Sequence, residues 1–231
     1  DDKAVTRRVV ERAGLVVPEQ IAADGDAGNV VPFLKRHGNV VVKPARGEQG
    51  RGVAVGLQTM DEVVKAVAEA RSVSDRVLVE SCFEGEDLRL VVIDGKLVAA
   101  AVRRPPRIVG DGERDVRTLI EHQSRRRAAA TGGESRIPID DETVRCLGAQ
   151  SIALDEVLAA GREVVVRKTA NLHTGGSIHD VTGIVHPRLV EAGCAAARAI
   201  RIPVAGIDLM VKSPTEPDYV FIEANERPGL A

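Results

Sequence analysis

Residues 204–225 read VAGIDLMVKSPTEPDYVFIEAN, two apolar runs on either side of a short turn that contains two prolines. This pattern predicts a β-hairpin. If the strands pair symmetrically about the turn and Lys212 opposes Tyr219, then the same register makes Asp208 oppose Glu223. The hairpin therefore predicts two carboxylates that face each other across adjacent strands.

A third polar side chain belongs to the same face. Asn225 follows Glu223 by two residues, and alternate residues of a strand project to one side. The neighbours are mostly apolar, where unpaired like charges are costly. Mg²⁺ takes oxygen ligands and completes its shell with water and nucleotide phosphates. We therefore predict a magnesium site of Asp208, Glu223 and Asn225. The alternative is an exposed sheet face with ordinary polar residues.

A second motif, KPARGEQGRG over residues 43–52, places three glycines within six residues. Apolar strands predicted over 39–44 and 53–57 flank it, so the loop joins two strands. This excludes a Walker A loop and a dinucleotide fingerprint, both of which lead into a helix. Glycines let backbone amides approach phosphate oxygens closely. We predict a flap over phosphates, with Lys43 contacting one of them. The alternative is a glycine-rich hairpin with a surface lysine.

The rest of the chain alternates between helical and extended patterns. We predict helices over 2–13, 61–70, 116–130 and 187–200. We predict strands over 76–80, 88–93, 97–102, 204–211 and 219–224, and a segment over 161–166 that leads into a strand. We predict loops over 105–112, 131–141 and 167–180. Hairpins outnumber βαβ crossovers, which favours an α+β fold with mainly antiparallel sheets. We predict two subdomains, residues 1–81 and 82–231.

Composition excludes several classes of function. The net charge is −2 and aromatic residues make up 2% of the chain, which argues against nucleic-acid and membrane partners. No apolar run approaches the roughly 20 residues of a membrane span. Cys82, Cys146 and Cys194 are too far apart for a compact metal site and odd in number, which indicates a reducing, cytoplasmic compartment. The chain lacks an initial Met, and we expect it to be part of a longer protein.

Lys43, the glycine-rich loop and the Asp208/Glu223/Asn225 hairpin follow one another in an order that resembles the ATP-grasp superfamily. The resemblance implies two α+β subdomains that hold ATP between them. It also implies an ADP-forming ligase that joins a carboxylate to an amine through an acyl phosphate. By the same resemblance, the ATP contacts are Lys3, Lys43, Gly47, Glu48, Gln49, Gly50, Arg51, Gly52, Glu80, Cys82, Phe83, Asp87 and Met210.

Shorter stretches narrow the resemblance. Residues 98–101, 109–112, 167–176 and 179–182 are similar to cyanophycin synthetases and bifunctional glutathione synthetases. The stretches 43–52, 123–128 and 225–231 are similar to the N-acetylglutaminylglutamine synthetase family. This resemblance implies amino acids or N-acylated amino acids as substrates. It also implies an acetyltransferase domain earlier in the same chain. Whether the protein forms a homo-oligomer is an open question at this point. The alternatives are a cyanophycin-type or glutathione-type ligase and a non-catalytic, ATP-binding regulatory module.

Three further residues are candidates for catalysis. Gly206 occupies a place where D-alanine–D-alanine ligases carry Arg, so we expect the cation for the transferred phosphate elsewhere and predict Arg167. Arg89 is predicted to hold the phosphate or a substrate carboxylate, and its alternative is a structural ion pair. Asn171 is predicted to belong to a substrate loop, and its alternative is a plain turn. We expect Arg125–Arg127 to be the solvated face of a helix rather than a substrate contact.

Overall fold

The structure is a computed structural model that describes residues 3–23, 28–46, 51–226 and 228, without the side chains of residues 3 and 4. Its buried apolar side chains form three separate cores. The chain divides into two compact units. The first comprises residues up to Val102 and those from Asp180 onward, and the second comprises Arg103–His179.

The first sheet has the order β1-β4-β2-β3 and is antiparallel. Its strands are β1 (Gln20–Ala22), β2 (Val40–Pro44), β3 (Ala54–Leu57) and β4 (Val77–Ser81), and its helices are α2 (Val30–His37) and α3 (Met60–Arg71). Phe33 of α2 and Val63 of α3 are buried with the strands. Helix α3 begins at a capping box between Thr59 and Glu62. Neither β1 nor α2 was predicted, because three- and eight-residue elements carry too little periodicity.

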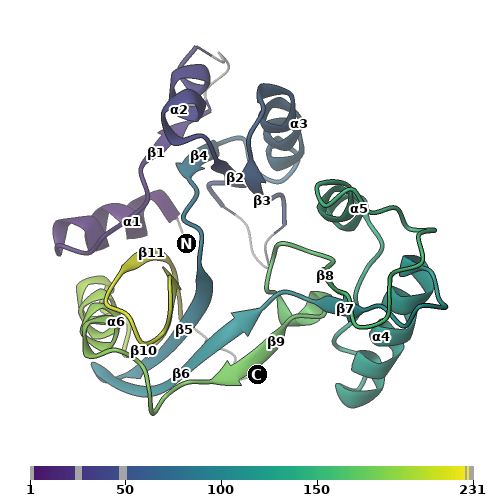
Figure 1. The fold of residues 1–231 in the computed structure, drawn as a ribbon. Helices are drawn as coiled ribbons and strands as arrows, with labels where there is room; N and C mark the ends of the chain where they lie inside the picture. The colour runs from purple at the N-terminus through teal and green to yellow at the C-terminus, as the bar shows by residue number, and fades with distance from the viewer. Residues whose placement is uncertain (1–2, 24–27, 47–50, 227, 229–231) are drawn as a thin grey trace. The chain divides into compact units, whose positions relative to one another are not determined.

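The second sheet has the order β11-β10-β5-β6-β9. Its strands are β5 (Glu86–Ile93), β6 (Lys96–Arg104), β9 (Ser177–Asp180), β10 (Val204–Val211) and β11 (Tyr219–Asn225). Helix α6 (Pro187–Ile200) packs against it (Figure 1). The approach is close at Gly193, where a Cβ would lie 2.6 Å from Leu90 Cδ1. Helix α1 (Lys3–Arg12) contributes Val10 to this core, although residues 1–81 were predicted to form a single subdomain.

The second unit is inserted between β6 and β9. It contains β7 (Arg107–Val109), β8 (Glu163–Val165), α4 (Val116–Ala130), α5 (Asp141–Gly148) and the 3₁₀ turn η1 (Leu172–Thr174). Its core includes Ile108, Ile120, Leu147 and Leu158. The predicted helix over 116–130 is confirmed. The loop predictions are wrong where β7, η1 and β9 lie, since such short elements depend on partners distant in sequence.

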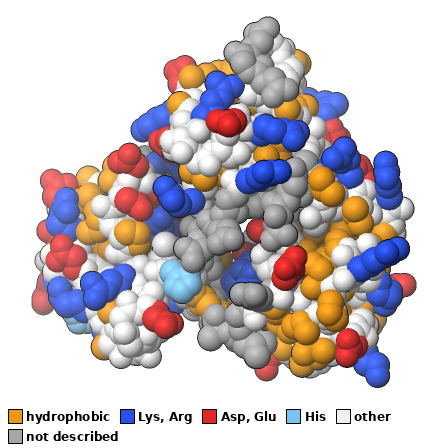
Figure 2. All heavy atoms as spheres, turned by 180° about the vertical axis from the view of Figure 1, so that it is seen from behind, with side chains coloured by type: hydrophobic (Ala, Val, Ile, Leu, Met, Phe, Trp, Pro, Cys, Tyr) orange, Lys and Arg blue, Asp and Glu red, His pale blue; other side chains and the backbone are white. Residues whose placement is uncertain are grey.

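The α+β class with mainly antiparallel sheets is confirmed, since each pairing whose register is given is antiparallel. Within the described residues, no helix has both the length and the apolar character that a bilayer crossing requires. Figure 2 shows acidic and basic side chains interspersed over one face, as the small net charge leads us to expect.

Candidate functional site

The β10–β11 hairpin brings the two predicted carboxylates together. Asp208 opposes Glu223, as predicted, but Tyr219 opposes Val211 rather than Lys212. The register shifts by one residue between Asp208 and Leu209, where β11 carries an extra residue. A β-bulge of this kind offsets the pairing on its two sides. The assumed pairing at the turn was therefore wrong, and the bulge restores the predicted pairing at the carboxylates.

A cation, Arg89, lies beside the two carboxylates on a third strand. Arg89 on β5 opposes Asp208 on the side away from β11, so Arg89, Asp208 and Glu223 lie side by side on three adjacent strands. Arg89 Nε donates to Asp208 Oδ1 at 2.8 Å, and Arg89 Nη2 donates to Oδ2 at 2.9 Å. Asp208 is 5% exposed, and this bidentate pair offsets the cost of burying its charge.

The side chains of Asp208, Glu223 and Asn225 fit a magnesium ion by their chemistry. Asn225 Nδ2 lies 3.5 Å from Asp208 Oδ2, so all three side chains meet on one face. Two carboxylates and one amide supply the oxygen donors that Mg²⁺ prefers. Among the described residues there is no cluster of three or more His, Cys, Asp or Glu. The role of this mixed set at a metal stays a prediction.

Gly206 explains why the neighbouring cation comes from another strand. A Cβ at Gly206 would lie 2.8 Å from Pro228 Cβ and 3.8 Å from Arg89 Nε. A longer side chain there would collide with Pro228, and the guanidinium of Arg89 already fills the adjacent space. The cation beside Gly206 is therefore Arg89.

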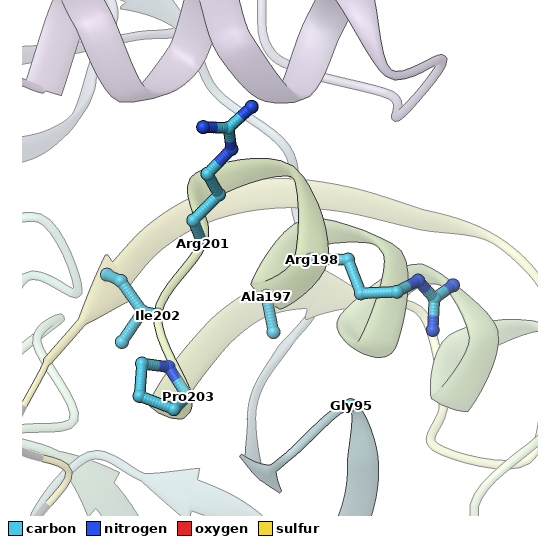
Figure 3. Close-up of a pocket in the computed structure, with 6 residues that line it drawn as sticks. All are labelled: Gly95, Ala197, Arg198, Arg201, Ile202 and Pro203. Carbon is cyan, nitrogen blue, oxygen red and sulfur yellow. The ribbon is translucent and has the colours of Figure 1, made fainter.

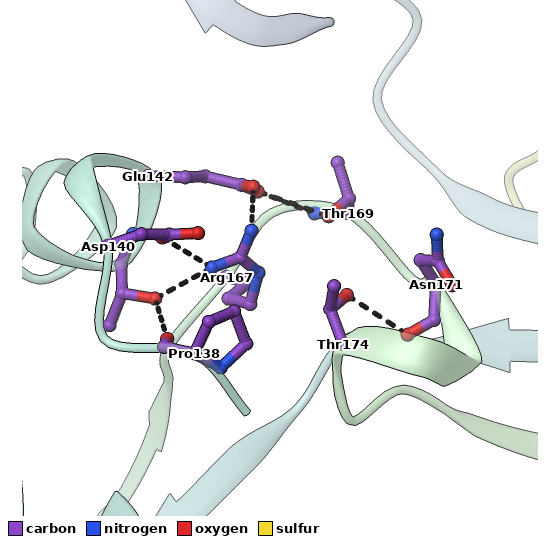
Figure 4. Close-up of polar contacts among 8 residues, drawn as sticks. Pro138, Asp140, Glu142, Arg167, Thr169, Asn171 and Thr174 are labelled. Carbon is purple, nitrogen blue, oxygen red and sulfur yellow. Dashed lines mark hydrogen bonds and ion pairs between the residues drawn. The ribbon is translucent and has the colours of Figure 1, made fainter. Parts of the chain in front are cut away.

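Arg167, predicted as that cation, has its charge compensated within the second unit (Figure 4). It is 5% exposed, and its Nη1 donates to Asp140 Oδ1 at 2.6 Å and to Thr143 Oγ1 at 2.9 Å. Its Nη2 pairs with Glu142. Desolvation raises the pKa of Asp140, but hydrogen bonds from Arg167 and Thr143 outweigh this effect, so the pKa is lowered overall. A role for Arg167 at the phosphate stays a prediction.

The same cluster holds the start of the loop that carries Asn171. Glu142 Oε1 accepts a hydrogen bond from Thr169 Oγ1 at 3.1 Å. Asn171 caps η1, since its side-chain oxygen accepts from the His173 N–H at 2.9 Å. Gly175 ends the turn with φ +94°. Asn171 therefore lies at an ordered turn, and its contact with substrate stays a prediction.

Lys43 and Glu80, both predicted ATP contacts, lie on the adjacent strands β2 and β4. Lys43 Nζ is 2.7 Å from Glu80 Oε2, and the two side chains are 10% and 6% exposed. The alternative that Lys43 is an ordinary surface lysine is therefore wrong. A buried cation at the end of β2, held by a buried carboxylate, is positioned rather than mobile.

Replacement of Lys43 by Met should weaken ATP binding by about 1.5–3 kcal/mol, the contribution of a charge-assisted hydrogen bond. Calorimetric titration of the full-length protein with ATP measures the loss. Lys65→Met removes an exposed lysine from α3 and serves as the control. Because Lys43 also compensates Glu80, urea unfolding of Lys43→Met is needed to separate lost folding from lost binding. An unchanged ATP affinity in Lys43→Met would exclude the phosphate contact.

The other predicted nucleotide contacts are only partly described. Gly47, Glu48, Gln49, Gly50 and the Lys3 side chain lie outside the described residues. Arg51 and Gly52 lie just before β3. Met210 opposes Asp87 across β10 and β5, two residues along the strand from Asp208. The Cys82 N–H donates to Asn39 O at 3.1 Å, and Phe83 follows on the stretch that leads to β5.

One surface pocket is lined by none of the predicted site residues. It has a volume of about 230 Å³ and lies between the β5–β6 turn and the end of α6 (Figure 3). Its two charged side chains, Arg198 and Arg201, extend in different directions. It contains no carboxylate, hydroxyl or thiol group, so we assign it no chemistry.

A family model described as "Prokaryotic glutathione synthetase, ATP-grasp domain" matches residues 12–138, more than half of the 231 residues. The chain belongs to the ATP-grasp family. In this ATP-grasp chain Asp208 and Glu223 lie on β10 and β11 and Lys43 lies on β2, and their roles toward metal and nucleotide stay predictions. ATP-grasp ligases use ATP and Mg²⁺.

Individual relatives agree with this ATP-grasp assignment. Cyanophycin synthetase from Crocosphaera subtropica is 32% identical over 247 residues, which cover 99% of this chain and 27% of the relative. The bifunctional glutathione synthetase from Pasteurella multocida is 25% identical with a TM-score of 0.60, covering 99% of this chain and 33% of that one. The predicted resemblance to both groups is confirmed. This chain spans about a quarter of the length of the cyanophycin synthetase.

One solved structure shows the fold alone. The ATP-grasp ligase PsnB, in complex with minimal precursor, Mg and ADP, is 14% identical with a TM-score of 0.54. The match covers 99% of this chain and 50% of that one. It supports the shared fold and leaves the substrates of this protein open.

Proposed function

We propose that the protein containing this chain is an ADP-forming carboxylate–amine ligase. The observation that carries the proposal is the row of Arg89, Asp208 and Glu223 on three adjacent strands. In the first step a substrate carboxylate oxygen attacks the γ-phosphorus of ATP, which forms an acyl phosphate and releases ADP. In the second step an amine attacks the acyl carbon, phosphate leaves, and the nitrogen loses a proton.

Asp208, Glu223 and Asn225 would hold magnesium in this reaction. When bound, the ion neutralises charge on the phosphates. Arg89 keeps the Asp208 carboxylate in place through two hydrogen bonds. A guanidinium has five N–H groups, so the others are available to the transferred phosphoryl group.

Lys43 and Glu80 would act on the nucleotide. Lys43 donates to a phosphate oxygen, and Glu80 keeps the ammonium group in position through the 2.7 Å contact. The glycine-rich loop over 47–52 would close over the phosphates, which protects the acyl phosphate from water. This flap stays a prediction.

For the substrates we propose an N-acylated glutamine as the acid and glutamine as the amine, as in N-acetylglutaminylglutamine synthetases. Support comes from the stretches 43–52, 123–128 and 225–231. A cyanophycin-type or glutathione-type ligase is the alternative, favoured by 32% identity to a cyanophycin synthetase. A regulatory module would not need the lysine and all three metal ligands. The upstream acetyltransferase domain, a homo-oligomer and a cytoplasmic location stay predictions.

The full-length protein should release phosphate from ATP when N-acetylglutamine and glutamine are supplied together, and it should form an amide-linked product of matching mass. Phosphate assay and mass spectrometry of the product test this. A product of aspartate and arginine would move the assignment to the cyanophycin-type ligases. No product with any amino-acid pair, despite ATP binding, would favour the regulatory module.

A further inference from the structure

The second unit contains a pocket that the nucleotide chemistry does not use. Its volume is about 300 Å³, and three arginines from three elements line it: Arg104 at the end of β6, Arg107 on β7 and Arg127 on α4. The one carboxylate in its lining, Glu163, is paired with Arg107 at 3.3 Å. Positive charge therefore exceeds negative charge, which favours an anionic ligand. We call this site the arginine pocket.

Helix α4 presents two polar side chains to the arginine pocket. Gln123 and Arg127 are four residues apart and so share one helix face. Arg127 Nη2 donates to Gly176 O, but Arg127 Nε is buried and has no hydrogen-bond partner among the described residues. Arg125 and Arg126 are exposed. The expected solvated face is therefore correct for Arg125 and Arg126 and wrong for Arg127.

Arg127 is half-buried, and its unpaired Nε–H group is costly to keep away from water unless something accepts its hydrogen bond. Desolvation lowers the pKa of its guanidinium, which still keeps its proton at neutral pH. A buried donor without an acceptor is uncommon in folded proteins. A ligand oxygen would supply the missing acceptor.

The arginine pocket is also lined by Ser177, His179 and Gly175. Ser177 and His179 alternate along β9, with Ser177 Oγ 3.1 Å from His179 Nε2. Gly175 leaves its part of the wall as bare backbone, since a Cβ there would lie 2.4 Å from Ile137 Cγ1. Hydroxyl and imidazole groups beside arginines are typical of sites that orient one polar small molecule.

We propose that the arginine pocket binds the carboxylate of an amino-acid substrate, at the carboxylate that is not phosphorylated. The proposal rests on the ligase function proposed above, because two amino-acid substrates bring one reacting and one unreacting carboxylate. Guanidinium groups match a carboxylate with two parallel hydrogen bonds. Glu163 at the rim disfavours a dianionic phosphate more than a monoanionic carboxylate.

Calorimetric titration of the full-length protein tests the arginine pocket directly, without ATP. The probes are glutamine and glutaminamide, which differ only at the carboxylate that is not phosphorylated, and N-acetylglutamine is the comparison because its one carboxylate is the reacting one. We expect glutamine to bind and glutaminamide to bind at least about 10-fold more weakly. Arg127→Gln should weaken that probe by about 10- to 100-fold and leave ATP affinity unchanged. Arg126→Gln, which removes the adjacent exposed charge, should change neither.

A second variant is needed to separate lost ligand binding from misfolding, because Arg127→Gln also removes the hydrogen bond to Gly176 O. Gln123→Glu keeps Arg127 and adds a negative charge to the pocket, and should weaken the same probe. In turnover assays both variants should raise the KM for one amino acid and leave the KM for ATP unchanged.

Three outcomes would overturn the arginine pocket as a carboxylate site. They are equal binding of carboxylate and amide, unchanged binding in both variants, and Arg127-dependent binding of inorganic phosphate in preference to either carboxylate. Failure of the ligase function is distinguishable. It would leave Arg127-dependent carboxylate binding intact while no amino-acid pair supports ATP turnover.

Discussion

Asp208→Asn and Glu223→Gln should each lower magnesium-dependent ATP turnover of the full-length protein by about 10²–10³-fold or more. Each substitution removes a charged oxygen ligand from the face shared with Asn225 while keeping the side-chain shape. An amide oxygen can still coordinate a dication, as proposed for Asn225, but it brings no negative charge and so holds the ion more weakly. Phosphate release as a function of magnesium concentration measures the loss.

The two variants differ in their expected cost to folding. Asp208→Asn also removes the partner of Arg89, a pair whose side chains are 20% and 7% exposed. Glu223→Gln leaves that pair intact and is the cleaner test. Asp218→Asn changes a 60% exposed carboxylate in the turn of the same hairpin and should leave turnover unchanged. Normal magnesium-dependent turnover in both Asp208→Asn and Glu223→Gln would rule out the metal site.

Arg167→Met should lower the free energy of unfolding by about 2–4 kcal/mol. Removing one partner of a fully buried ion pair costs about 3–5 kcal/mol. The carboxylates left behind are partly exposed, with side chains of Asp140 and Glu142 at 46% and 20%, so solvent reduces that cost. Urea unfolding measures the change. Arg162→Met, which breaks an exposed pair with Glu156, should stay within about 0.5 kcal/mol of the wild type.

This experiment also separates the two roles open to Arg167. A stability loss that accompanies the activity loss identifies a residue that holds the Asn171 loop. Lost activity with an unchanged unfolding midpoint would instead support the predicted contact with the transferred phosphate.

The contribution of the Arg167 cluster should depend on pH. The pKa of Asp140 is lowered in the folded state, so the stabilisation is present above the ordinary carboxylate pKa and is lost as pH falls through the lower, folded value. The difference in stability between wild type and Arg167→Met should therefore shrink below about pH 4. A constant difference down to about pH 2 would show that Asp140 does not contribute.

Local sequence patterns predicted much of the secondary structure of the chain. The two apolar runs of 204–225 predicted both strands and the opposition of Asp208 and Glu223, and the charged stretch 116–130 and the Ala-rich stretch 187–200 predicted α4 and α6. These features depend on residues close in sequence, whose side chains repeat with the period of the strand or helix. The short elements β1, α2 and β7 were missed because three to eight residues rarely complete a distinguishable period.

Only the tertiary structure decided which strands and helices lie next to one another. Arg89 is 119 residues from Asp208 in sequence, and only the order β11-β10-β5 makes them partners. The buried Nε atom of Arg127 and the carboxylate-bound Arg167 likewise follow from packing inside the inserted unit. The sequence by itself determined the side chains on each strand and the existence of the hairpin, whereas the bulge that sets its register was visible only in the structure. Only the tertiary structure decided the neighbouring strand and the burial of each charge, because these depend on contacts between distant segments, which local periodicity does not encode.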